Sequence, residues 1–118
     1  MKHALLFACI IIIAMALRLP DLAQRPMHTD EAVHAIKFAD LLENGDYQYD
    51  PREYHGPTLN YFTLIPAWMS SASYIAEFNE VGLRIVPVSF GILLVLLLLS
   101  INTGLGYPSV ISAALLTA

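Results

Sequence analysis

The chain has 118 residues, of which 57% are hydrophobic and 14% are charged, and its mean hydropathy is +0.59. This composition is typical of a membrane protein and not of an ordinary soluble domain. The formal net charge of -4 excludes a basic nucleic-acid-binding surface, so we expect no nucleic acid among its partners.

The first apolar segment, residues 4–17, contains no charged side chain and is bracketed by two basic residues. Leu19 and Leu22 extend this apolar segment toward the thickness of a bilayer, which predicts a first transmembrane helix over residues 1–22. A cleaved secretory signal is the alternative, because residues 14–16 form an Ala-Met-Ala pattern after an apolar run. The bulky residues 10–13 immediately before that pattern favour the uncleaved helix.

The next segment, residues 23–80, is expected to be a loop, and its part from about Gln24 to His55 is polar and acidic. Residues 21–53 hold eight carboxylates against three Lys or Arg side chains. That balance argues against docking onto anionic headgroups. Ionisable groups beside a bilayer are costly to place and usually belong to a reaction site or an ion path. We therefore expect the function to lie in this loop.

A first surface helix is predicted over about residues 30–44. Thr29 or Asp30 is suited to its N-cap, acidic residues favour its first turn, and Asn44-Gly45 is suited to its end. Helical spacing predicts that Asp30, His34 and Lys37 project from one face and converge on a small site. The apolar face is predicted to contain Ala32, Ala35, Ile36, Ala39 and Leu42.

A second surface helix is predicted over about residues 57–76, after an irregular connector. An apolar stripe runs along it, with polar residues on the other side and Tyr61 and Trp68 suited to a membrane interface. A helix lying flat on the membrane fits this pattern, although its length also permits a span. The stripe comprises Leu59, Phe62, Ile65, Met69, Ala72 and Ala76, and the polar side comprises Asn60, Thr63, Ser70, Ser71 and Tyr74.

Residues 85–118 contain no Asp, Glu, Lys, Arg or His, and glycine-containing breaks divide them. We expect a second transmembrane helix over residues 81–102 and the truncated start of a third over residues 108–118. The latter segment is too short to cross about 30 Å of hydrocarbon. The pattern predicts an all-α fragment from the N-terminal region of a larger, polytopic membrane protein.

Four short motifs occur in the order and at the spacing of a known family. The chain resembles the N-terminal region of GT-C glycosyltransferases, which are polytopic enzymes akin to protein O-mannosyltransferases and the lipid A aminoarabinose transferase. It looks closer still to a prokaryotic branch described as flippase-activity-associated in N-glycosylation. The motifs are Asp30-Glu31, Gly45-Asp46-Tyr47, Tyr54-His55-Gly56-Pro57 and Gly82-Leu83-Arg84.

The resemblance implies an integral protein of a bacterial or archaeal cell membrane, with residues 23–80 as an extracytoplasmic loop that carries two juxtamembrane helices. It also implies transfer of a sugar, with inversion, from a polyprenyl-phosphate donor to a glycan, lipid or protein acceptor. The loop's acidic residue would act as general base or as a metal ligand. In this chain that residue is Asp30, with Glu31 beside it as a second catalytic candidate.

The departing lipid phosphate is negatively charged and needs a cation or positively charged hydrogen-bond donors, so basic residues of the loop are candidates for substrate binding. Relatives place an acidic residue and a lysine before the proline that corresponds to Pro57, whereas this chain has His55-Gly56. His55 can still donate to phosphate, and Arg52 and Arg84 are the nearest replacements for the lysine. His34 is a further substrate-binding candidate. A divalent metal, Mg or Mn, is a candidate cofactor, with Asp30 as its ligand in a cluster of His28, Asp30, Glu31 and His34.

Two alternatives remain open. One is a non-catalytic, flippase-associated protein that binds the lipid carrier through the same loop. The other is a membrane-tethered, metal-binding protein that carries a signal peptide.

Overall fold

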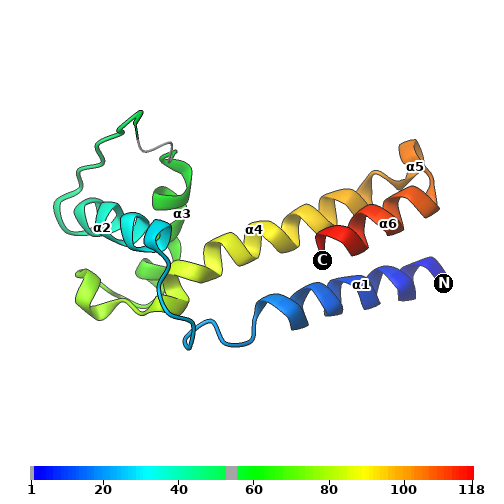
Figure 1. Cartoon of the computed structure of the whole chain (residues 1–118), viewed down its shortest axis with the longest axis horizontal. Helices are drawn as coiled ribbons and strands as arrows, with labels where there is room; N and C mark the ends of the chain where they lie inside the picture. Colours follow the sequence, from blue (N-terminus) through cyan, green and yellow to red (C-terminus); the bar gives the residue numbers. More distant parts are fainter. Residues whose placement is uncertain (1, 53–55) are drawn as a thin grey trace. The chain divides into compact units, whose positions relative to one another are not determined.

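A computed structural model describes residues 2–52 and 56–118, and Figure 1 shows the helices into which they fold. The expected all-α class is confirmed, since no strand occurs within those two ranges. The elements are α1 (Lys2–Arg18), α2 (Thr29–Asn44), α3 (Thr58–Met69), the 3-10 helix η1 (Ile75–Glu77), α4 (Glu80–Ser100), α5 (Asn102–Leu105) and α6 (Tyr107–Thr117).

The chain divides into two compact units. One comprises Met1–Pro20 with Pro87–Ala118, and the other comprises Asp21–Val86. The predicted loop, residues 23–80, therefore lies within a unit of its own, which also includes the first two turns of α4.

The first unit is held together by an apolar cluster from three helices. Two of its buried residues are alanines, and small side chains let helix backbones approach closely, as they do inside membranes. The buried members are Ile10 and Ala14 of α1, Val95 and Leu99 of α4, and Val110 and Ala114 of α6.

Helix lengths differ from the two expected full spans at the first of them. Within the described ranges, α4 alone is both long enough and apolar enough to cross a bilayer, and its 21 residues extend about 32 Å. The helix expected over residues 1–22 ends at Arg18, because the chain turns at Asp21, whose φ of 61° is left-handed. The apolar helices α1 and α6 are too short to pass the same test.

The second unit begins with α2, whose two ends are both capped. His28, one residue before the expected start, is the N-cap: its Nδ1 accepts from the Asp30 backbone N–H at 3.4 Å. Glu31 Oε2 accepts in return from the His28 backbone N–H at 3.1 Å, which completes a capping box. At the other end, Gly45 adopts a φ of 69° and donates to the Leu41 carbonyl.

Helix α3 is shorter than the sequence predicted, since it ends at Met69 and not near Ala76. Ser70 donates its hydroxyl to the Ala67 carbonyl at 3.0 Å. Ser71 then adopts a left-handed φ of 57°, which reverses the chain. Serine side chains compete for backbone hydrogen bonds in this way and favour helix ends. The reversal brings η1 back to α2, where the Ile75 N–H donates to Glu43 Oε1 at 2.9 Å.

Helices α2 and α3 pack side by side with a mixed apolar and polar core (Figure 1). The buried apolar residues of this unit's cluster are Phe38, Ala67 and Leu83. Asn60 and Thr63 are also buried, and so α3 turns its polar side toward α2 and leaves its apolar stripe exposed. The apolar face predicted for α2 is rotated, because Ile36 is exposed and His34 points inward with Phe38 and Leu41.

Candidate functional site

A salt bridge in the second unit joins Glu31 at the start of α2 to Arg84 at the start of α4. Arg84 Nε donates to Glu31 Oε1 at 2.9 Å, and Nη2 donates to Oε2 at 3.0 Å. Two parallel hydrogen bonds of this kind are strong and geometrically specific. The Arg84 guanidinium holds the pKa of the Glu31 carboxyl below its ordinary value, mainly through these hydrogen bonds.

The guanidinium of Arg84 is otherwise fully engaged, and its side chain is only 7% exposed. Nη1 donates to the Leu22 carbonyl and to Glu80 Oε2, and Nη2 also donates to the Arg25 carbonyl. These contacts and the two to Glu31 make five hydrogen bonds, one for each N–H that an arginine possesses. Arg84, expected as a phosphate ligand, therefore serves in this structure as a clamp between α2, α4 and the turn before α2.

Asp30 differs sharply from its neighbour Glu31. Its side chain is 73% exposed in the first turn of α2, and Oδ2 lies 3.8 Å from His28 Nδ1, which is also exposed. An anionic side chain is stabilised at this end of a helix by the backbone dipole. The two adjacent acidic residues are thus separated: Glu31 is tied to Arg84, whereas the Asp30 carboxylate is open to a ligand.

His34 does not lie on the outer face that the spacing predicted for it. Only 8% of the residue is exposed, and its Nδ1 lies 2.9 Å from Asn60 Oδ1. Its Nε2 lies 3.3 Å from Thr63 Oγ, which donates to the Leu59 carbonyl at 2.7 Å. His34 is thus turned toward α3, whereas the Asp30 side chain is exposed, so the prediction that His34 projects outward is wrong.

The other candidates lie in the connector between α2 and α3. Arg52 is exposed, and its backbone N–H donates to Asp50 Oδ1 at 2.8 Å, which forms a local turn. His55 lies outside the described residues, together with Glu53 and Tyr54.

Two of the four residues proposed for a divalent metal have protein partners in this structure. Divalent hard cations such as Mg²⁺ require several oxygen ligands. In the described parts of the chain, no three His, Cys, Asp or Glu side chains come together in a suitable group. Glu31 faces Arg84, and His34 is buried against Asn60. Two members of the predicted cluster thus face other protein groups in this structure, and a divalent metal bound through Asp30 stays a prediction.

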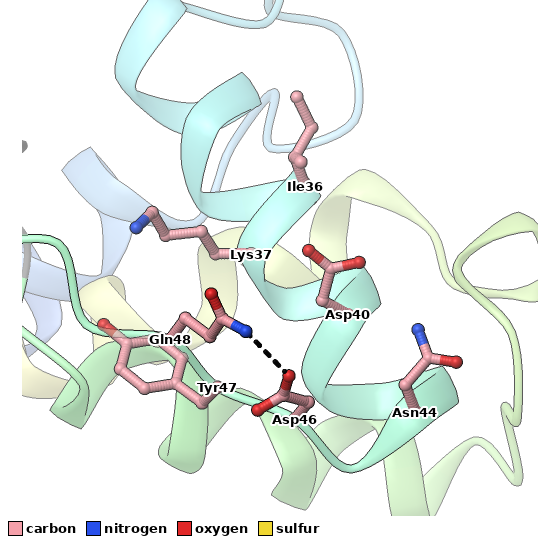
Figure 2. A pocket seen from close by; sticks show the side chains of 7 residues that line it. All are labelled: Ile36, Lys37, Asp40, Asn44, Asp46, Tyr47 and Gln48. Atoms are coloured by element: carbon pink, nitrogen blue, oxygen red, sulfur yellow. Dashed lines mark hydrogen bonds between the residues drawn. The ribbon is translucent and has the colours of Figure 1, made fainter.

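A cavity of about 510 Å³ lies on the outer side of α2, where the sequence indicated no site beyond its Gly45-Asp46-Tyr47 motif. Figure 2 shows its lining of charged, amide and aromatic side chains. A second sequence signal is the spacing of four between Asp40 and Asn44, which places both on one helix face. Helix α2 supplies Ile36, Lys37, Asp40 and Asn44, and the segment after it supplies Asp46, Tyr47 and Gln48.

Comparisons of the chain with protein-family models, with curated proteins and with solved structures gave no match.

Proposed function

We propose that this chain is part of an integral-membrane glycosyltransferase of the GT-C kind, which transfers a sugar from a polyprenyl-phosphate carrier to an extracytoplasmic acceptor. The observation that carries the proposal is the contrast between Asp30 and Glu31. The Asp30 side chain is 73% exposed in the first turn of the capped helix α2, whereas the neighbouring Glu31 is bound to the buried Arg84. That arrangement holds one reactive carboxylate at a defined place and leaves it accessible.

Asp30 would act as the general base. An acceptor hydroxyl must lose its proton as its oxygen attacks the anomeric carbon, and a carboxylate within hydrogen-bonding reach can take that proton. Attack from the side opposite the departing phosphate inverts the anomeric centre. Glu31 and Arg84 are positioning residues in this proposal, because they touch each other and not the substrate.

The departing polyprenyl phosphate needs a cation. Arg84 is a poor partner because each of its N–H groups already has an acceptor. Arg52 is exposed on the same unit, so we assign it the phosphate contact.

Placement at a membrane surface is supported by the outer side of α3. Trp68 is 82% exposed and Met69 is 75% exposed, and Tyr61, Phe62 and Ile65 are exposed as well. Contiguous exposed apolar side chains with Trp and Tyr among them are typical of surfaces that meet a bilayer. Helix α4 of the same chain has the length and composition of a span. A lipid-linked donor would be presented at such a boundary.

The test is an Asp30→Asn change in the full-length protein in lipid nanodiscs, supplied with polyprenyl phosphate carrying a radiolabelled hexose. Loss of a general base lowers a transfer rate by about 10²–10⁴-fold. Asp21→Asn is the matched control, since Asp21 is also exposed and its left-handed backbone tolerates asparagine. Unchanged transfer in Asp30→Asn would refute the role of Asp30. Translocation of the lipid-linked sugar without transfer would favour the flippase-associated carrier-binding protein instead.

A further inference from the structure

We propose that the cavity beside α2 binds a neutral, hydroxyl-rich ligand, and that this ligand is the glycan part of the acceptor. The identification of the ligand as the acceptor rests on the proposed function, whereas the binding of a hydroxyl-rich ligand does not. The cavity's volume of about 510 Å³ is within the size range of small-molecule sites, which is about 300–1,000 Å³.

Two of its side chains are available to a ligand. The Asp40 carboxylate and the Asn44 amide have no hydrogen-bond or ion-pair partner within residues 2–52 and 56–118. They lie one helical turn apart on α2 and line the same cavity. The Asp40 carboxylate can accept hydrogen bonds there, and the Asn44 amide can both donate and accept. Carboxylate and amide groups together match sugar hydroxyls, each of which both donates and accepts.

The opposite side of the cavity is held in place by contacts within the protein. Gln48 Nε2 donates to Asp46 Oδ2 at 3.1 Å, as Figure 2 shows. The Tyr47 ring packs against the Tyr61 ring of α3, with the ring centroids 5.8 Å apart. An aromatic ring beside hydrogen-bonding groups offers a surface for the apolar C–H side of a sugar. These contacts leave little to be ordered when the ligand binds.

The charge of the cavity favours a neutral sugar over a phosphate as its ligand. Among the described lining residues, Lys37 contributes one positive charge and Asp40 and Asp46 contribute two negative charges, which gives this part of the lining a net charge of -1. A phosphate would meet two carboxylates and one ammonium group, whereas a neutral saccharide meets no charge penalty. The cavity is therefore assigned to the acceptor glycan and not to the phosphate of the donor.

The experiment is saturation-transfer NMR on the full-length protein in nanodiscs, with methyl mannoside, maltose and chitobiose as neutral probes and glucose 6-phosphate as the charged comparison. We expect saturable binding of at least one neutral probe and weaker binding of the sugar phosphate. Asp40→Asn should weaken the neutral probe about ten-fold, because a hydrogen bond to a charged acceptor is about twice as strong as one to a neutral acceptor. Asp21→Asn should leave binding unchanged.

Several results would overturn the proposal: no saturable binding of any neutral probe, tighter binding of glucose 6-phosphate than of the neutral probes, or equal binding in Asp40→Asn and in the unmodified protein. An Asn44→Ala variant provides a second check and should also weaken binding. Failure of the transferase is distinguishable from these results. Absence of transfer with Asp40-dependent saccharide binding refutes the transferase alone, whereas Asp30-dependent transfer without saccharide binding refutes the cavity assignment alone.

Discussion

The buried contact between His34 and Asn60 provides a sharp test of how α2 and α3 are held together. His34 is 8% exposed and Asn60 is 2% exposed, and the atoms that join them are 2.9 Å apart. Asn60→Ala removes the amide oxygen that lies 2.9 Å from the buried His34 Nδ1. His34→Leu leaves the Asn60 amide unpaired. A buried polar group without a partner costs about 1–3 kcal/mol, so each single change should destabilise the α2–α3 packing by about that amount.

The double variant should cost less than the sum of the two single variants. Removing both partners leaves no unpaired group from this contact, so the coupling energy should be about 1–2 kcal/mol. Thr63 keeps its hydroxyl bond to the Leu59 carbonyl in every variant, so it adds little to the difference. The assay is native-state hydrogen exchange read by mass spectrometry, which gives local opening free energies for the amides of α2 and α3.

Strict additivity of the two single changes would refute this reasoning. It would mean that His34 and Asn60 are each solvated or paired elsewhere. An effect confined to α1 or α6 would also contradict it, because those helices belong to the other compact unit.

Three further predictions concern the backbone and the Glu31–Arg84 pair. Gly82→Ala would place a Cβ 2.3 Å from the Phe78 ring, which packs on Phe38. After the gain in helix propensity is subtracted, this clash should lower the opening free energy at the start of α4, measured by hydrogen exchange, by about 0.5–2 kcal/mol. Gly104→Ala is the control and should not destabilise its helix, because the space around its Cβ is open. Ser71→Gly should raise the thermal midpoint, because the left-handed φ of 57° disfavours serine, whereas Ser71→Val should lower it. The folded pKa of Glu31 is lowered, so the stability that the carboxylate contributes is present above its ordinary pKa and is lost as the pH falls through the folded pKa. The thermal midpoints of the unmodified protein and Glu31→Gln should therefore differ at neutral pH and converge in acid, once the pH is below the folded pKa of Glu31. A difference that persists when Glu31 is fully protonated would count against the ion pair.

Helix α2 could be predicted almost to the residue because its signals are local. An acidic first turn and a glycine after the last turn are visible in the sequence, and the structure differs by one residue at the N-cap. The end of α3 was missed for the opposite reason. The reversal at Ser71 is stabilised in part by the contact of Ile75 with Glu43, which is 32 residues away in the chain, and helix periodicity carries no information about such a contact.

The candidate site was predicted only in part, because the sequence shows which residues are ionisable but not which of them pair. Glu31 and Arg84 are 53 residues apart, and each was considered as a separate reactive group. His34 was placed on the polar side of α2 because histidine counts as polar. Its spacing with Phe38 and Leu41 fits the buried face, and Asn60 and Thr63 repeat the same pattern on α3. Matched polar residues at helical spacing on two neighbouring helices are the signal that was available.

The pairing of Glu31 with Arg84 gives the neighbouring Asp30 its position. Successive residues on an α-helix point about 100° apart, so the rotation that turns Glu31 toward Arg84 necessarily turns Asp30 away from it. The capping box at His28 and the Arg84 bonds to the Leu22 and Arg25 carbonyls hold the same turn from two further sides. The direction of the Asp30 carboxylate is thus set by the contacts of Glu31 and Arg84 and by the neighbouring N-cap His28. A change at Glu31 that loosens this turn should therefore lower the rate of a reaction at Asp30, although the Asp30 carboxylate itself is unchanged. This is the behaviour of a positioning residue and not of a second base.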